Sequence, residues 1–196
     1  FSIYLVNIIL PQEVSSIDNR AFSWCQGLKQ ITIPDSVRFI GDGAFESCKN
    51  LQSITIPNSV DYIGYAAFFK CINLEKITLS NQITSIGAYT FAACHKLSNV
   101  TIPNKVKTID EAAFAECRSM TKITIPDSVT SIGISAFNKC TNLNSINIPD
   151  KVTLIGDYAF EDCSSLTSIK LPSNLKTMGD VVFANCSGLI ICSEWP

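Results

Sequence analysis

Apolar and polar positions alternate along the chain in a pattern that repeats every 23 residues. From one leucine to the next cysteine the pattern reads L-x-x-I-x-I-P-x-x-V-x-x-I-G-x-x-A-F-x-x-C, as in "LQSITIPNSVDYIGYAAFFKC" at 51–71. Self-similarity at this period predicts a solenoid, in which each unit buries its apolar face against its neighbours. Eight units carry a phenylalanine and a cysteine three residues apart: Phe22/Cys25, Phe45/Cys48, Phe68/Cys71, Phe91/Cys94, Phe114/Cys117, Phe137/Cys140, Phe160/Cys163 and Phe183/Cys186.

The I-x-I segment of each unit has the alternation of a short strand with one buried face. Proline follows it in most units and ends the strand, because proline cannot donate to a ladder. The Asp or Asn that comes next suits a turn that bonds its own backbone. Stacked about 4.8 Å apart, such strands predict a parallel sheet along one face of a body roughly 40 Å long.

The rest of each unit predicts shorter elements. The V-x-x-I piece indicates a second extended segment, and the glycine after it is expected to take a positive φ at a corner. The A-F-x-x-C piece has helix-like spacing and predicts a turn or two of α or 3₁₀ helix. The predicted fold is therefore an α/β repeat solenoid, a right-handed coil with a parallel β-sheet on one face. Because the other face carries only short extended and helical turns, we expect weak curvature.

The repeat frame extends over almost the whole chain and predicts a single solenoid domain at 1–196. Residues 1–11 contain a partial first repeat, in which "LVNIILP" aligns with "LKQITIP". The apolar start resembles the middle of a signal peptide, but it lacks a basic leader and a small-residue cleavage site. Over 189–196 the pattern decays, with Cys192 in an isoleucine column and Glu194 in an apolar one. Since the pattern begins within a unit, we expect a fragment of a longer protein.

Composition narrows the class of partner. Apolar residues make up 46% of the 196 residues, which argues against disorder. The net charge is −2 and only 16% of the residues are charged, so composition indicates no electrostatic attraction to nucleic acid or to a membrane surface. We therefore expect no nucleic-acid partner and no insertion of this segment into a membrane.

The cysteine ladder allows three interpretations. Zinc sites need clustered ligands, whereas the ladder cysteines are 23 residues apart and the chain has one histidine. Disulfides between units are conceivable, but bridged Cβ atoms lie nearer (about 3.8 Å) than stacked side chains, so the coils would have to approach in pairs. Free cysteine is a small and frequently buried hydrophobe. Buried thiols are the favoured interpretation, and no metal or cofactor is expected.

Catalytic constellations are scarce. A thiol nucleophile would need a base, and His95 stands directly beside Cys94, where adjacent side chains rarely converge. Acidic pairs occur at 110–111 and 161–162, where a solvated surface is the usual explanation. The sequence therefore predicts a protein that is not an enzyme.

Two sets of outward-facing residues are candidates for ligand binding. The first is the exposed strand face, although threonine also favours strands and polar residues keep a sheet soluble. The second is a set of aromatic residues in the first three units, which form a patch or simply cover one end of the stack. The strand-face set is Thr32, Thr55, Thr78, Thr101, Thr124, Lys76 and Lys122, and the aromatic set is Trp24, Phe39, Tyr62, Tyr65 and Phe69.

The repeat resembles the BspA-type leucine-rich repeats, as shown by "LQSITIPNSV", "KITIPDSVTSIGISAFNKC" and "LIGDYAFEDCSSLTSI". This resemblance covers about residues 5–192 and implies a leucine-rich-repeat solenoid in a secreted or cell-surface protein. It also implies adhesion to host or microbial protein or glycan through a non-catalytic binding scaffold, with no catalytic residues to transfer. The alternative is a structural spacer array that presents another domain, and an enzyme is the least favoured class.

Overall fold

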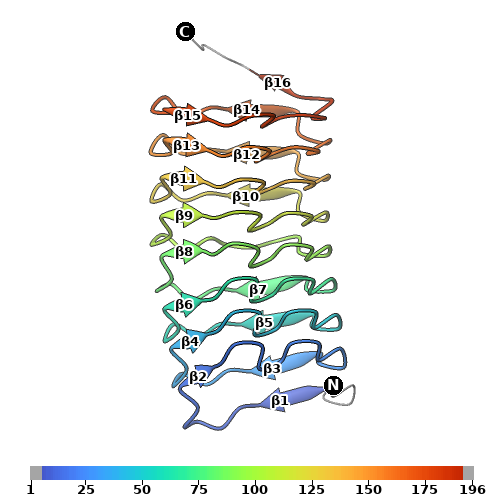
Figure 1. The fold of residues 1–196 in the computed structure, drawn as a ribbon, viewed down its shortest axis with the longest axis vertical. Coiled ribbons are helices and arrows are strands. Elements are labelled where there is room, and N and C mark those ends of the chain that lie inside the picture. Colours follow the sequence, from blue (N-terminus) through green and yellow to red (C-terminus); the bar gives the residue numbers. More distant parts are fainter. Residues whose placement is uncertain (1–5, 192–196) are drawn as a thin grey trace.

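A computed structural model describes residues 6–191, which wind into coils of 23 residues stacked along one axis (Figure 1). Each complete coil contains a first strand, a turn, a shorter second strand and a run of linked turns that leads to the next coil, except that single bridges replace the first strand at 98–103. The first strands are β1 (Asn7–Ile9), β3 (Gln30–Thr32), β5 (Ser53–Thr55), β7 (Lys76–Thr78), β10 (Lys122–Thr124), β12 (Ser145–Asn147), β14 (Ser168–Lys170) and β16 (Ile190–Ile191). The second strands are β2 (Ser16–Ile17), β4 (Phe39–Ile40), β6 (Tyr62–Ile63), β8 (Ser85–Ile86), β9 (Thr108–Ile109), β11 (Ser131–Ile132), β13 (Leu154–Ile155) and β15 (Thr177–Met178).

Neighbouring coils pair in parallel and in the register of the repeat, except that β16 pairs one residue early, with Ile191 opposite Ile169 of β14. Ile8 of β1 lies opposite Ile31 of β3, and Ile123 of β10 lies opposite Ile146 of β12. The first strands form three sheets, with breaks between β3 and β5 and between β7 and β10, and the second strands form two sheets with a break between β6 and β8. Between β7 and β10 the single bridges Lys76–Asn99 and Thr101–Thr124 continue the pairing. The pairing of β1 with β3 places residues 7–9 in a sheet. Cys192 and Glu194 lie outside the described residues.

The described residues contain no helix, so the expected helical turns, and with them the α/β class, are wrong. The A-F-x-x-C piece runs as linked turns whose N–H groups alternate in direction. Cys48 N–H donates within its own coil to Phe45 O at 3.1 Å, whereas Ser47 N–H donates to Phe69 O of the next coil at 2.7 Å. A helix would direct these donors along its own axis. Half of them join the coils instead.

Two residues in each such run take the left-handed conformation, which ends any helix before it can form. In the second coil these are Gly43 (φ 57°) and Ser47 (φ 58°). Non-glycine residues with positive φ are Arg20, Trp24, Ser47, Ala66, Lys70, Tyr89, Ala93, Ala112, Glu116, Ser135, Lys139, Tyr158, Asp162, Val181 and Asn185.

The glycines that follow the second strands have a role other than the expected one. Among the described glycines only Gly43 has a positive φ, so the prediction of a positive φ in the column of Gly64 and Gly156 is wrong. A Cβ on Gly64 would lie 2.6 Å from the backbone nitrogen of Asp42, and one on Gly156 would lie 2.5 Å from that of Ile134. These glycines are needed because the preceding coil lies too close for a side chain.

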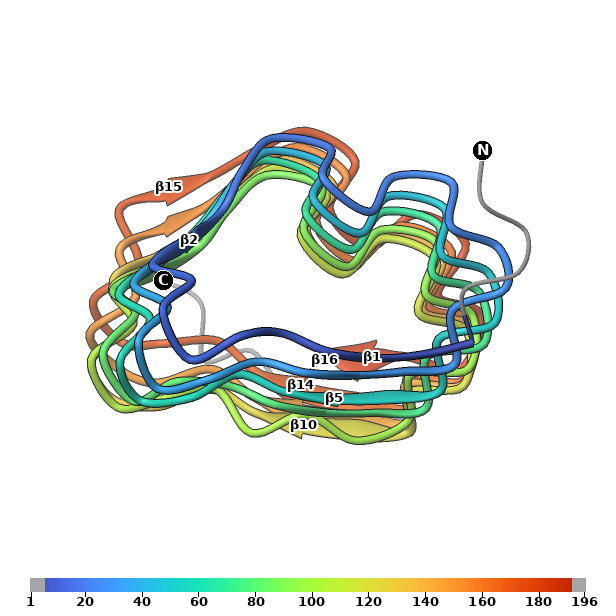
Figure 2. The same cartoon turned by 90° about the horizontal axis from the view of Figure 1, so that it is seen from below.

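Columns of identical apolar residues fill the interior. The rings of Phe45 and Phe68 stack at 5.2 Å between centroids, and the same stacking continues to Phe183. Burying one such side chain stabilises the fold by about 1.5–3 kcal/mol. Seen down the stack, the middle coils around β10 are displaced to one side of the coils at both ends, so the solenoid is weakly curved (Figure 2).

Candidate functional site

The ladder cysteines are free thiols that lie inside the stack, and only Cys186 is partly exposed. The Cys94 thiol donates to Phe68 O of the preceding coil at 3.2 Å, and this carbonyl also accepts the N–H of Cys71 at 3.1 Å. The Cys94 thiol therefore satisfies the remaining acceptor capacity of a buried carbonyl. The same contact joins Cys48 to Phe22, Cys71 to Phe45, Cys117 to Phe91, Cys140 to Phe114, Cys163 to Phe137 and Cys186 to Phe160.

Burial also makes these thiols unreactive. Removal from water raises the pKa of the Cys140 thiol to about 12, and it raises the pKa of Cys71 and Cys117 in the same direction. Because the thiolate is the nucleophile and the metal ligand, a thiol with a raised pKa serves neither role near neutral pH. The cysteine ladder is structural.

The strand face carries a hollow of about 1190 Å³ that spans β3, β5, β7 and the coil at 98–103. We refer to it as the strand-face hollow. Exposed hydroxyl, amide and charged groups line it, together with the strand isoleucines Ile31, Ile54 and Ile77. Of the residues predicted from the sequence, Thr32, Thr55, Thr78, Thr101 and Lys76 line the hollow. Thr124 and Lys122 continue the same two columns on β10, outside it.

The turns after the first strands add Asp35, Asn58 and Asn81 to the lining of the hollow. Sequence analysis identified this Asp/Asn column but predicted bonds to its own backbone. Instead, Asn58 Oδ1 accepts the N–H of Asn81 in the next coil at 2.9 Å. In the same column, Asp150 Oδ1 accepts the N–H of Ser173 at 3.2 Å, and this bond lowers the pKa of Asp150. The Asp/Asn column therefore joins successive coils. Its side chains line the hollow because the coils stack in register.

The aromatic residues predicted from the sequence divide into separate groups. Phe39 and Tyr62 stack on neighbouring second strands, with ring centroids 5.1 Å apart. Tyr65 and Phe69 both contact Tyr89, at 5.5 and 6.4 Å between centroids. Tyr89 was missed because its column holds no other aromatic residue in the first three units.

Trp24 is 44% exposed on the first coil, and among the described residues it pairs with no other ring. Tyr65 is 54% exposed, and Phe69 is partly buried beneath the ammonium group of Lys70, which lies 4.8 Å from the ring centroid. The aromatic residues predicted from the sequence therefore lie in separate groups on the surface and form no single patch.

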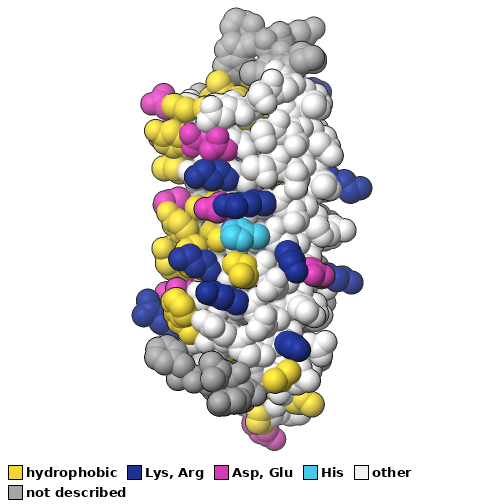
Figure 3. Space-filling view, turned by 90° about the vertical axis from the view of Figure 1, so that its right-hand side faces the viewer, with side chains coloured by type: hydrophobic (Ala, Val, Ile, Leu, Met, Phe, Trp, Pro, Cys, Tyr) yellow, Lys and Arg dark blue, Asp and Glu magenta, His cyan; other side chains and the backbone are white. Residues whose placement is uncertain are grey.

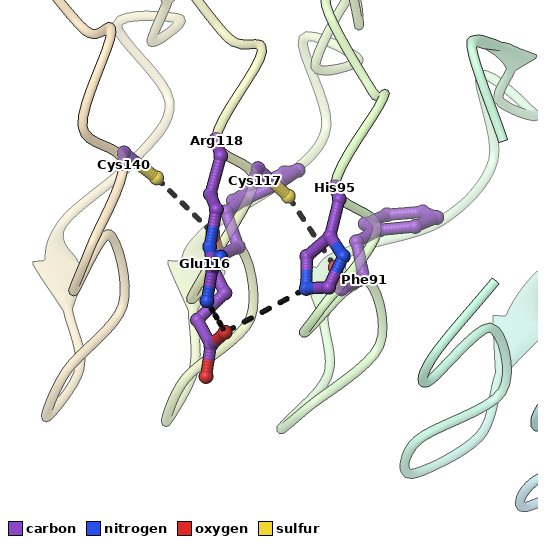
Figure 4. A network of polar contacts seen from close by, with 7 residues as sticks. Phe91, His95, Glu116, Cys117, Arg118 and Cys140 are labelled. Atoms are coloured by element: carbon purple, nitrogen blue, oxygen red, sulfur yellow. Dashed lines mark hydrogen bonds and ion pairs between the residues drawn. The ribbon is translucent and has the colours of Figure 1, made fainter. Parts of the chain in front are cut away.

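The only thiol and imidazole that are neighbours in sequence point to different surroundings. The His95 side chain reaches Glu116 of the next coil, with 3.6 Å between Nε2 and Oε2, and the same carboxylate oxygen lies 2.6 Å from Arg118 Nη2 (Figure 4). Cys94 faces the core. Thiol and imidazole therefore form no catalytic pair.

The acidic pairs noted in the sequence hold neighbouring side chains. Glu111 accepts the hydroxyl of Tyr89 at 2.6 Å, and this bond raises the pKa of Tyr89. Glu161 accepts the side-chain amide of Asn138 at 2.8 Å. Within residues 6–191, no group of three or more His, Cys, Asp or Glu side chains is arranged to hold a metal ion. That part of the chain also includes no helix long and apolar enough to cross a membrane.

Comparison with known proteins matches the repeat to a family model. The model for the BspA type leucine-rich repeat region matches residues 2–120 and 107–193. No curated protein matches the chain.

Solved bacterial structures have the same fold. A leucine-rich repeat protein from Bacteroides ovatus is 30% identical over 92% of this chain and 58% of its own, with a TM-score of 0.64. One from Eubacterium ventriosum is 29% identical over 86% of this chain and 45% of its own, with a TM-score of 0.77. A leucine-rich cell surface protein from Faecalibacterium prausnitzii is 30% identical over 95% of this chain and 59% of its own, with a TM-score of 0.56. The chain thus spans about half to three fifths of these relatives.

Proposed function

The chain belongs to the BspA-type leucine-rich repeat family, and we propose that it is a non-catalytic scaffold that binds an extracellular protein or glycan at the strand-face hollow. Repeat proteins of this kind generally act as binding scaffolds, because stacking creates a long surface of regularly spaced side chains. The proposal depends on one observation: the hollow lies over β3, β5, β7 and the coil at 98–103.

The chemistry of the hollow supports a polar ligand. Thr55 and Thr78 stand one coil apart on paired strands, with Lys76 beside them. Hydroxyl groups both donate and accept hydrogen bonds, and the ammonium group of Lys76 donates up to three. The ladder between β5 and β7 holds Thr55, Thr78 and Lys76 in place, and a single bridge joins Lys76 to Asn99 of the next coil. A rigid surface of this kind loses little conformational entropy when a ligand binds.

We place the protein at the cell surface or in the secreted fraction, where it mediates adhesion. The Faecalibacterium prausnitzii relative is a leucine-rich cell surface protein, which supports this location. A spacer array that presents another domain is the second candidate. It is favoured by the plain polar columns of β12 and β14, which continue the strand face beyond the hollow.

Variants within one column of the strand face can test the proposal. The chain is screened against extracellular-matrix proteins and glycans, and each ligand found is titrated against Thr55→Arg and Thr78→Arg by calorimetry. An arginine at either position fills part of the hollow while remaining on an exposed strand position. We expect each substitution to weaken binding at least tenfold.

Thr124→Arg is the matched control, since Thr124 occupies the same exposed column outside the hollow. We expect it to leave binding within about twofold of the unmodified chain. If all three variants bind alike, the hollow is not the site. If the screen finds no ligand, the spacer-array hypothesis replaces the binding-scaffold hypothesis.

A further inference from the structure

Five consecutive coils each place one lysine or arginine on the turn that leads into the first strand. These residues lie within two positions of a ladder cysteine, and because the cysteines stack in register, their side chains emerge along one edge of the solenoid. In Figure 3, Lys and Arg side chains gather along this side of the molecule, around the histidine. We refer to the set as the basic edge: Lys49, Lys70, Lys96, Arg118 and Lys139.

Backbone hydrogen bonds fix the spacing of the basic edge. Lys70 N–H donates to Ala92 O of the next coil at 2.9 Å, and Lys139 N–H donates to Glu161 O at 2.8 Å. The coils are about 4.8 Å apart, so five coils place five cations along roughly 20 Å. The positive charges therefore form a line that runs parallel to the solenoid axis.

Acidic groups neutralise part of this line. Lys96 pairs with Glu75 at 3.8 Å and Arg118 with Glu116 at 2.6 Å, both at exposed positions. Exposed pairs of this kind are weak and exchange readily with other anions. Among the described residues, Lys49, Lys70 and Lys139 enter no ion pair.

Glu46, Glu161 and Asp162 lie on the same turns as the residues of the basic edge, whereas most of the other acidic residues lie on different turns of the coil. The latter follow the first strand or the second strand, whereas the basic edge precedes the first strand. The net charge of −2 therefore conceals an uneven distribution. These distant acidic residues are Asp18, Asp35, Asp42, Asp110, Glu111, Asp127, Asp150, Asp157 and Asp180.

We propose that the basic edge binds a linear acidic polysaccharide, with the sulfate or carboxylate groups of successive sugars set against cations of successive coils. A line of charges on a rigid support matches a polymer whose charges also recur along one axis. The turns between the cations add amide and hydroxyl groups, among them Asn142 and Thr141, that suit sugar hydroxyls. This surface is separate from the strand-face hollow and shares only the premise that the chain is a binding scaffold.

The same edge is a poor fit for single-stranded nucleic acid, which needs aromatic rings on which bases stack. Phe69 lies beside the basic edge, and its ring is covered by Lys70 and contacts Tyr89. Trp24 occupies the column of Lys70 on the first coil, before the basic edge begins, and its ring is 44% exposed. One exposed ring beyond the end of the basic edge provides no row of platforms for successive bases. A glycan needs none, because its charges and hydroxyls suffice.

Calorimetric titration with a heparin oligosaccharide tests the proposal at about 150 mM salt. The edge variant combines Lys49→Gln, Lys70→Gln, Arg118→Gln and Lys139→Gln. We expect the unmodified chain to bind and the edge variant to bind at least tenfold more weakly. Because the contacts are ionic, affinity should also fall at least about tenfold between 50 and 200 mM salt.

The matched control removes four exposed lysines at the far end of the first strand and near the second strand: Lys105→Gln, Lys107→Gln, Lys151→Gln and Lys176→Gln. It has the same net charge as the edge variant, and we expect less than twofold loss. Equal losses in both variants, absence of heparin binding, or equally tight binding of single-stranded DNA would each overturn the proposal. Unchanged melting temperatures show that both variants fold. A negative result here does not affect the proposed function of the strand-face hollow, because that proposal is tested with different variants.

Discussion

From Cys48 onward, each ladder cysteine donates a hydrogen bond to the preceding coil, which explains why the ladder holds cysteine rather than another small apolar residue. Alanine would leave the phenylalanine carbonyl with one partner and would also leave a void. Serine has a shorter bond from Cβ to oxygen, so its hydroxyl would stand farther from the acceptor in a site that excludes water. Sulfur is the atom whose size and bond length fit this gap between coils.

We expect Cys94→Ser to lower the free energy of unfolding by about 1–3 kcal/mol, because a buried hydroxyl with a poorly placed acceptor is costly. Cys94 is fully buried, and its thiol lies 3.2 Å from Phe68 O. Urea denaturation measures the loss. Cys25→Ser is the matched control: Cys25 heads the ladder, and among the described residues its thiol has no carbonyl acceptor. It should lose less than half as much, and a loss at Cys94 of only a few tenths of a kcal/mol would contradict this account.

The raised thiol pKa values predict sensitivity to alkali. Burial raises the pKa of Cys140 from 9.0 to about 12, so the unfolded chain ionises this thiol at a pH where the folded chain still holds the proton. The stability that this thiol contributes is therefore complete below pH 9 and is lost as the pH rises toward 12. Between pH 8 and 10 the loss amounts to about 1.4 kcal/mol.

Cys140→Ala has no such proton to lose. The difference in unfolding free energy between the unmodified chain and this variant should therefore shrink by about 1.4 kcal/mol from pH 8 to pH 10. Denaturation of both proteins at each pH gives the difference. A difference that stays constant would show that the thiol ionises equally easily in both states.

At the scale of the element, the second strand ends at a corner where coils approach most closely. The glycine column lies at this corner, and most of its members face backbone atoms of the preceding coil at distances that no side chain tolerates. Gly87 differs, since a Cβ there would meet Thr90 Oγ1 at 3.4 Å and Ile63 O at 3.5 Å. The same column accepts Asp110 in the next coil. Glycine is therefore needed only where the backbone of the preceding coil lies too close for a side chain.

Gly156→Ala should destabilise the protein by about 1–3 kcal/mol, because the new methyl group would overlap the backbone of Ile134 and force the coils apart. Gly87→Ala is the matched control in the same column. It should be neutral or stabilising by up to about 1 kcal/mol, since alanine restricts the unfolded chain. Equilibrium unfolding in urea compares the two. Similar losses at both positions would mean that backbone conformation, rather than proximity, selects glycine.

The strands were predictable from sequence and the linked turns were not. The alternation of polar and apolar residues in "SITIP" predicts which side chains face the core, because a period of two residues is typical of strands. The spacing of Ala44, Phe45 and Cys48 fits one face of a helix, yet linked turns produce the same spacing. The left-handed residues that separate them carry no signal, since Ala66, Tyr89 and Val181 are not residues that usually adopt this conformation. Pairing between coils overrides their local preference.

At the scale of the whole molecule, stacking creates surfaces that a single unit does not reveal. The threonine column was readable from sequence, but the extent of the hollow depends on how successive coils sit against one another. The basic edge was missed because Lys49, Lys70 and Lys96 occupy three different columns of the repeat and the net charge averages over all faces. Only the register of the coils brings them to one edge.

Each coil contacts only its neighbours, so a lost side chain should disturb the stack locally. Phe114 stacks between Phe91 and Phe137, whereas Phe22 is partly exposed and stacks on Phe45. We expect Phe114→Ala to cost about 3–5 kcal/mol and Phe22→Ala clearly less. Hydrogen exchange should rise first in the coils on both sides of Phe114, around β8, β9, β10 and β11, and only near β1 to β4 for the Phe22 variant. If either substitution accelerates exchange evenly along the stack, the coils unfold as one unit and the local description is wrong.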